Sequence, residues 1–383
     1  KLKALQVQGA DELARGGTWW DKAKEVYINI LLARPLTQVR NFLGNSFAAT
    51  TSAVERELGG WLSIEEKGLI RGGGLAQIQG MTAAFGDGVK AFADAYKHVS
   101  PEEMTKLDFI PHLIQGKLGR IINVPTDTLR GMDNFFKAIL GRGDMYAEAI
   151  RKGTQQGLSG QALGDYVARR MAIPTQDMIE HAKGFVLHGT FQDDLGTLGR
   201  NAQRLLQSGP LALLFPFMKT PINLAKYGWN RTPGLQFLSQ SLYQDILAGG
   251  TRADLAIGRL TLSNMMGMFW YGLAQQGLLT GGGPADPNLQ RTWRTTKQPY
   301  SILGKDGWYP LTNIEPATTP IALIADFAEI RNQLDDPTAE QTAMAIALAG
   351  TRDIVDKTYW QTVGDIVELM DSIRVGEQPG QSA

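Results

Sequence analysis

The chain lacks cysteine altogether and has only four histidines among its 383 residues. Without cysteine it has no disulfide, no thiol nucleophile, no iron–sulfur cluster and no Cys-ligated zinc. It also lacks an excess of either charge, because 38 Lys and Arg balance 38 Asp and Glu. A globally basic nucleic-acid-binding protein and an acidic disordered chain are therefore both poor descriptions. Residues 1–20 contain no apolar segment typical of a secretory signal.

Helical periodicity dominates the sequence, and the alternation typical of strands is nearly absent. Apolar residues recur at spacings of three and four in the segments 19–33, 36–58, 126–156, 174–187, 235–247, 252–279, 320–334 and 352–374. We expect the second segment to end at Gly59-Gly60 and the third to be interrupted around Gly141–Gly143. Residues 300–311 (YSILGKDGWYPL) instead predict a β-hairpin that forms a surface flap. The sequence thus predicts an all-α, elongated multi-helix bundle with one small β-hairpin near residues 300–311.

Charge and composition divide the chain into four predicted regions. They are an N-terminal helical region (1–125), a central helical region (126–285), a hairpin insert (286–315) and acidic C-terminal helices with a tail (316–383). Residues 200–314 carry 11 Lys and Arg but 4 Asp and Glu, whereas residues 315–383 carry 4 and 12. These blocks of opposite sign could attract each other within one fold, or head to tail between subunits.

The signatures of common enzyme classes are absent. The chain has no phosphate-binding GxxxxGK[ST] loop, no HExxH pair and no GxSxG nucleophile in a strand-to-helix turn. Residues 74–78 (GLAQI) resemble a stretch of lytic transglycosylases, with Glu57 upstream as the candidate general acid for cleaving a glycosidic bond. His181 and His188 are interpreted as structural, because metal-binding pairs on a helix usually lie closer together. We expect no cofactor and no metal.

A long uncharged segment covers residues 260–285. Residues 260–279 have the length of about 20 residues that is needed to cross a bilayer. Polar side chains within it, such as Asn264 and Gln275, favour a buried central helix of a bundle instead. Contact with a membrane or a partner, and a permanent membrane span, are the alternatives. The residues singled out for such contact are Met265, Met266, Met268, Phe269, Trp270 and Tyr271.

A short segment places cations beside aromatic residues: Lys226, Tyr227, Trp229 and Arg231. Such an arrangement can stack bases while it neutralises phosphates, or lie at a layer of lipid headgroups. The solvated rim of a helical hairpin is the interpretation we favour. Binding of DNA through Lys219, Lys226 and Arg231 is the alternative.

Three segments, taken in their order along the chain, resemble a known family. They are Leu31–Asn45 (LLARPLTQVRNFLGN), Met132–Met145 (MDNFFKAILGRGDM) and Phe215–Pro233 (FPFMKTPINLAKYGWNRTP). The segments are similar to those of very long phage and prophage proteins that carry large polyvalent protein-associated domains. The resemblance covers roughly residues 20–330. Two positions depart from the family pattern, because Asp144 stands where glutamate is usual and Lys219 where arginine is usual.

This resemblance implies a non-enzymatic structural component of a phage virion. It implies an internal or ejection protein of a short-tailed phage, which is packaged in the capsid, leaves through the tail, and reassembles into a DNA-ejection conduit across the host envelope. The implied partners are other virion and ejection proteins, the portal or tail and further copies of the chain, with the host membrane and DNA as additional ones. A lytic transglycosylase-like virion enzyme and a DNA-associated prophage protein are the alternative functions.

The motif residues themselves allow two interpretations. The resemblance singles out as interaction residues Arg34, Thr37, Asn41, Asn45, Asp133, Phe136, Lys137, Lys219, Thr220, Pro221, Asn223, Arg231, Thr232 and Pro233. However, Thr37, Asn41 and Asn45 have the spacing i, i+4, i+8 of one helix face, which is typical of interhelical hydrogen bonds. A threonine directly before a proline is typical of a helix start or a turn. These residues therefore either contact partners or fix the fold.

Overall fold

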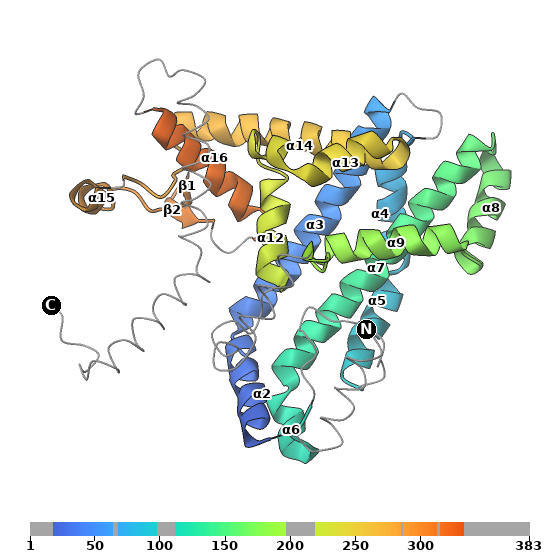
Figure 1. The fold of residues 1–383 in the computed structure, drawn as a ribbon, viewed down its shortest axis with the longest axis horizontal. Coiled ribbons are helices and arrows are strands. Elements are labelled where there is room, and N and C mark those ends of the chain that lie inside the picture. Colours follow the sequence, from blue (N-terminus) through green and yellow to red (C-terminus); the bar gives the residue numbers. More distant parts are fainter. Residues whose placement is uncertain are drawn as a thin grey trace.

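A computed structural model describes residues 18–63, 68–97, 112–196, 219–284, 286–311 and 315–332 (Figure 1). The described chain is helical apart from one two-stranded hairpin, which confirms the predicted fold class. The first helices are α2 (Trp19–Leu32), α3 (Pro35–Leu62), α4 (Gly73–Ala83), α5 (Phe85–Ala95), α6 (Gly116–Ile122), α7 (Val124–Gln155), α8 (Gly160–Ala172) and α9 (Gln176–Gly189). The later elements are α12 (Lys219–Trp229), the 3-10 helix η1 (Leu235–Leu238), α13 (Gln240–Ala248), α14 (Gly250–Gln275), α15 (Pro287–Trp293), β1 (Ser301–Gly304), β2 (Gly307–Pro310) and α16 (Thr318–Arg331).

Two long helices, α3 and α7, organise the other elements (Figure 1). α4, α5, α8 and α9 pack along α7, while α14 packs along α3 and also contacts α13 and α16. Between α3 and α7 lies an apolar cluster, whose buried members are Ala49, Ala84, Phe136, Ile139 and Leu140. α3 therefore lies between two groups of helices. One group packs around α7, and the other contains α14, α13 and α16.

α3 does not end at Gly59-Gly60 as expected but continues to Leu62. A Cβ atom on Gly59 would lie 2.4 Å from the carbonyl oxygen of Asp254, and one on Gly60 would lie 2.2 Å from that of Ile70. The two glycines serve as sites where other backbone segments approach the helix. Neighbouring backbone packs in the space that side chains at these two positions would occupy. The helix therefore continues through the glycine pair.

α7 is likewise continuous, so the expected interruption at Gly141–Gly143 is wrong. A Cβ atom on Gly143 would lie 2.4 Å from Cγ of Met81 and 2.9 Å from the carbonyl oxygen of Gln77. This glycine lets α4 approach α7 closely. The sequence analysis also missed α8, and it extended the helix that begins near Arg252 beyond its end at Gln275.

The predicted hairpin is present, with Ser301 paired to Pro310 and Gly304 to Gly307. It is not a free flap, because Ser301 at its base is fully buried and the Leu303 N–H donates to the Leu278 carbonyl over 2.8 Å. The adjoining loop Gly281–Gly283 is tied to α16. Its three N–H groups donate to the carboxylates of Asp326 and Glu329 over 2.8 to 3.1 Å.

Two glycines of α14 provide a matched test of close helix packing. A Cβ atom on Gly258 would lie 2.0 Å from the Glu55 carbonyl oxygen, whereas one on Gly272 meets nothing within 4 Å. We expect Gly258→Ala to lower the free energy of unfolding by about 1–3 kcal/mol, because α3 and α14 must separate. Gly272→Ala should raise it by about 0.5–1 kcal/mol. Urea unfolding followed by circular dichroism measures both, and equal effects would contradict this packing.

Candidate functional site

A buried ion pair joins α3 to the third motif segment. The guanidinium of Arg231 donates from Nε to Oε1 of Glu55 over 2.8 Å and from a terminal nitrogen to Oε2 over 3.0 Å. Arg259 of α14 lies 3.7 Å from the same carboxylate. Arg231 also covers the ring of Tyr227, whose hydroxyl lies 2.7 Å from Oγ1 of Thr51. Burial raises the pKa of the Tyr227 hydroxyl above its usual value.

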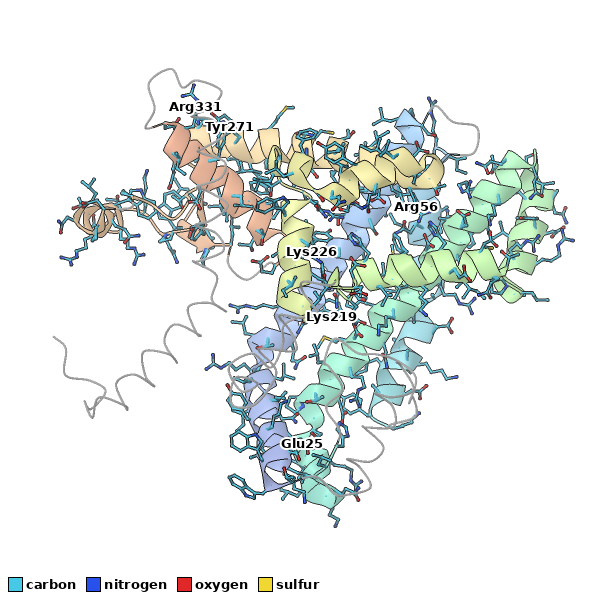
Figure 2. All side chains as sticks on the ribbon, viewed as in Figure 1. Glu25, Arg56, Lys219, Lys226, Tyr271 and Arg331 are labelled. Atoms are coloured by element: carbon cyan, nitrogen blue, oxygen red, sulfur yellow. The ribbon has the colours of Figure 1, made fainter. Side chains whose placement is uncertain are left out.

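The next residue of α3, Arg56, forms a second buried network on the other flank (Figure 2). Its guanidinium pairs with Asp144 of α7, and its Nε donates to Oε1 of Gln77 over 2.8 Å. Nδ1 of His181, on α9, lies 2.7 Å from Oδ2 of Asp144. Asp144 is therefore the residue that connects α3, α7 and α9.

The protonation states of this network follow from its contacts. Burial acts to raise the pKa of the Asp144 carboxyl, but the Arg56 charge and the hydrogen bond with His181 outweigh it and hold the pKa below the usual 3.8. The hydrogen bond with Asp144 raises the pKa of His181 above 6.5, against the effect of burial. The arrangement therefore favours charged forms of both residues.

The second and third motif segments meet at the turn after α9. Asp133 is buried, and both of its oxygens accept from Nε2 of Gln192, over 2.9 and 2.8 Å. Lys137, one turn along α7, lies 3.0 Å from the same carboxylate. Asn223 of α12 donates to the carbonyl oxygens of Phe191 and Asp193 over 3.0 and 2.9 Å. The segment 190–193 thus connects two motifs that lie far apart in the sequence.

Phe191 shows why this turn needs such support. Its φ of 58° lies in the left-handed region, which is costly for a bulky side chain. The side chain is buried against Tyr227, with ring centroids 5.3 Å apart. The hydrogen bonds that Asn223 donates hold the strained backbone in place, so Asn223 has a structural role.

The first motif segment lies at the start of α3. Thr37 and Asn41 are partly buried and Asn45 is buried, whereas Arg34 at the helix start is exposed. Phe42 of this segment contacts Phe136 of the second, with ring centroids 5.5 Å apart. Phe136 itself belongs to the apolar cluster between α3 and α7. The structure therefore brings the first two motifs together.

The two Thr-Pro pairs of the third motif segment lie at the start of α12 and shortly after its end. Lys219, Thr220 and Pro221 form the first turn of α12, where Lys219 and Thr220 are partly buried. Beyond its end, Thr232 is buried and donates to the Gly228 carbonyl over 2.8 Å. Pro233 packs against Gly267 of α14, where a Cβ atom would lie 2.3 Å from its ring. The second pair thus connects α12 to α14.

The predicted solvated rim at residues 226–231 is wrong. Tyr227 and Arg231 are buried, because Arg231 is the partner of Glu55. Only Lys226 of the cations in this stretch is exposed. Arg231 is accordingly not available to neutralise a phosphate.

Glu57, the candidate general acid, caps a helix. Its carboxylate accepts from the N–H groups of Gly72 and Gly74 over 2.9 and 3.0 Å, and from Nε1 of Trp61 over 2.9 Å. Gly72 and Gly74 lie at the start of α4, where N–H groups have no partner within the helix. These contacts account for Glu57 as a structural residue. Among the described residues, no three His, Asp or Glu side chains are grouped as metal ligands.

The uncharged segment is not a buried helix, contrary to expectation. Within α14, Met265, Met266, Met268 and Phe269 are exposed, Met268 by 73%. Trp270 and Tyr271 are partly buried. None of the helices in the described ranges is both long and apolar enough to span a bilayer.

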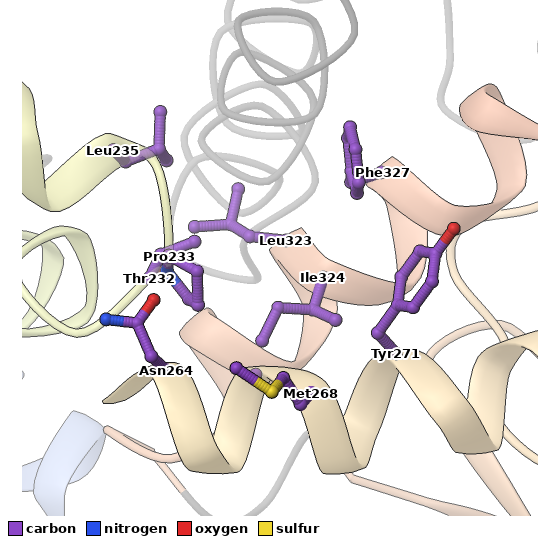
Figure 3. Close-up of a pocket in the computed structure, with 10 residues that line it drawn as sticks. Thr232, Pro233, Leu235, Asn264, Met268, Tyr271, Leu323, Ile324 and Phe327 are labelled. Carbon is purple, nitrogen blue, oxygen red and sulfur yellow. The ribbon is translucent and has the colours of Figure 1, made fainter. Parts of the chain in front are cut away.

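Beside this exposed face lies an apolar pocket of about 220 Å³ (Figure 3). α14 forms one wall with Asn264, Met268 and Tyr271. α16 forms the opposite wall with Leu323, Ile324 and Phe327, and Thr232, Pro233, Leu235 and Gly267 complete the lining. The pocket offers mainly apolar surface, so it suits a hydrophobic group and carries no arrangement for bond-making chemistry.

The sequence analysis missed three buried polar residues, the charged Glu55 and Arg56 and the amide Gln192. A signal for Arg56 was present, because Ser52 and Arg56 continue the polar face of α3 that begins with Thr37, Asn41 and Asn45 at helical spacing. Glu55 and Gln192 have no comparable signal. No family model, curated protein or solved structure matches the chain.

The Glu55–Arg231 pair predicts a strong asymmetry between single and double substitutions. We expect Arg231→Met to lower the free energy of unfolding by about 3–5 kcal/mol, because it leaves the buried Glu55 carboxylate with only Arg259. Glu55→Met combined with Arg231→Met should cost less than the single change. The control is Arg252→Met, whose pair with Asp245 is 60% exposed on the arginine side and should change stability by less than about 1 kcal/mol. Urea unfolding measures all three.

His181 predicts a pH dependence with a definite sign. Because its pKa is raised in the folded chain, its contribution to stability is present below its ordinary pKa of 6.5 and is lost as the pH rises through the folded-state value. The difference in unfolding free energy between the wild type and His181→Gln should therefore be larger at about pH 6 than at about pH 9. Urea unfolding at both pH values provides the comparison. A difference that grows with pH would exclude the Asp144–His181 interaction as described.

Proposed function

We propose that this protein is a structural subunit of a phage particle, an internal ejection protein that assembles with its own copies and other virion proteins into a conduit for DNA. The observation that carries the proposal is the set of large apolar side chains that α2 and the first half of α3 leave exposed. On α2 they lie opposite an inner face on which polar side chains are buried beside Ile28 and Leu32. A helical subunit with such a face is suited to assembly.

The inner face of α2 combines apolar residues, Ile28 and Leu32, with buried polar side chains. Glu25 is buried and accepts from the N–H groups of Leu113 and Ile114, each over 3.0 Å, and from Nδ2 of Asn123 over 2.6 Å. Asn29 donates to Oδ1 of Asn123 over 2.9 Å. Figure 2 shows Glu25 on α2, close to α6. These contacts fix which side of α2 faces inward.

The outer face of α2 and the first half of α3 is apolar. Trp19 is 80% exposed and Val39 50% exposed, and the further exposed residues are Trp20, Ile30, Leu31, Leu36, Phe42 and Leu43. Leu36, Val39 and Leu43 have the spacing i, i+3, i+7 of one helix face. Exposed apolar surface of this extent marks an interaction site in a soluble protein.

Three further features support an ejection protein. The resemblance of the three motif segments points to proteins of this kind. A chain without cysteine has no disulfide that would prevent unfolding in a narrow tail. Buried ion pairs fix orientation while adding little net stability, which suits a chain that must unfold and refold.

The alternatives have less support from the residues on which they depend. Glu57 holds the start of α4, so a peptidoglycan-cleaving enzyme would have to free it from three donors. A DNA-binding surface on the positively charged segment 200–314 could not use Arg231, because Arg231 is buried with Glu55. Of the three residues singled out for DNA binding, only Lys219 and Lys226 would remain for phosphate contacts.

The decisive experiment is mass spectrometry of purified particles of the phage that encodes this protein, before and after ejection is triggered in vitro. We expect its peptides in full particles and their loss from emptied capsids. Absence of the peptides from full particles would contradict a virion role. Retention of the peptides in emptied capsids would contradict ejection.

Assembly itself is tested by Val39→Asp. We expect the wild type to form oligomers whose proportion rises with protein concentration, as measured by static light scattering. Val39→Asp should shift it to the monomer, because a buried charge in an apolar interface has no partner. Thr50→Asp is the matched control, since Thr50 is exposed on the same helix but already polar. Unchanged assembly of Val39→Asp with a native circular dichroism spectrum would exclude this face as the interface.

A further inference from the structure

α14 and α16 form an apolar groove, and Met268 is the residue of the exposed α14 face that also lines the pocket within it. Met265, Met268 and Phe269 are exposed at helical spacing on α14. The pocket beside Met268 opens between the two helices (Figure 3). A groove of this kind accepts the apolar side of an amphipathic helix, and methionine adapts its shape to such a partner.

The size of the pocket indicates what enters it. Its volume of about 220 Å³ exceeds the about 150 Å³ of an engineered apolar cavity that binds benzene. One large aromatic or aliphatic side chain therefore fits. Asn264 and Tyr271 add polar groups to the wall, so the hydroxyl of a tyrosine would find partners there.

The chain itself contains a segment of matching chemistry beyond α16. Residues 352–374 lie outside the described ranges, and their sequence predicts an amphipathic helix. Its apolar residues follow spacings of four and three along one face: Val355, Tyr359, Val363, Ile366, Met370 and Ile373. This face carries the aromatic side chain that the pocket would accept.

We infer that residues 352–374 dock through this apolar face into the groove between α14 and α16 of the same chain. The inference does not depend on the proposed function. The segment is tethered close to the groove, because Phe327 lines the pocket and α16 ends at Arg331. About 20 residues separate α16 from the segment, and a random coil of that length spans about 25 Å. Such a tether gives an effective concentration in the millimolar range, which favours the same chain over a second copy.

Charge also favours this occupant. Residues 200–314, which include α14, carry 11 Lys and Arg against 4 Asp and Glu. Residues 352–374 carry five acidic side chains (Asp353, Asp356, Asp365, Glu368 and Asp371) and three basic ones. The opposite net signs of the two blocks steer their encounter, whereas the residues that line the pocket are uncharged.

The absence of cysteine allows a direct test in the full-length chain. Met268→Cys introduces the single thiol, and its rate of alkylation by a small maleimide reports whether the α14 face is covered. We expect Val363→Asp combined with Ile366→Asp to raise that rate at least tenfold, because charges on the apolar face prevent docking. Gln361→Asp, on the polar side of the segment, is the matched control and should leave the rate unchanged.

Two further measurements distinguish docking by residues 352–374 of the same chain from docking by a second copy. If the same chain covers the groove, the alkylation rate of Met268→Cys stays constant when the protein is diluted a hundredfold. A rate that rises on dilution would overturn the inference in favour of a second copy. If Val363→Asp combined with Ile366→Asp leaves the alkylation rate unchanged, this segment does not dock in the groove and the inference is overturned. A thiol placed at Val39 should react at the same rate in both backgrounds, which controls for unfolding.

Discussion

The fold depends on two consecutive charges in the C-terminal third of α3. Glu55 and Arg56 are both buried, and successive residues of a helix point about 100° apart, so they face different flanks. Glu55 meets the cations Arg231 and Arg259, and Arg56 meets the anion Asp144. Because a buried charge without a partner is very costly, α3 cannot slip or rotate relative to its neighbours. We interpret these pairs as devices that fix register between the two halves of the fold.

Buried and partly buried carboxylates also hold the loops in place. Glu25, Glu57 and Asp254 each accept from backbone N–H groups of a loop or a helix start. Asp326 does the same for the loop Gly281–Gly283. An oxygen acceptor of this kind satisfies N–H groups that would otherwise be unpaired inside the protein. The acidic side chains that sequence reasoning could mistake for catalytic groups are thus used to close the fold.

The sequence predicted the helices and the hairpin because their signals are local. Apolar spacing located α2, α3 and α7 to within a few residues, and Gly304 with Gly307 marked the turn of the hairpin. The role of a glycine within a helix depends on what approaches it, so Gly59-Gly60 was mistaken for a helix end. The site was less predictable still. Asp133 is recognisable as a motif residue, but its partner Gln192 lies 59 residues away without a pattern of its own.

The exposed side of α2 and α3 sets the strength of the assembly it can support. Burial of an apolar side chain such as Ile30, Leu36, Val39 or Leu43 contributes about 1.5–3 kcal/mol. Four such residues would contribute about 6–12 kcal/mol, which is comparable to the about 4–15 kcal/mol cost of association. This face alone therefore supports only weak, reversible contact between subunits. Stable assembly requires either further surfaces or a high local concentration, and the proposed packing inside a capsid would provide the second condition.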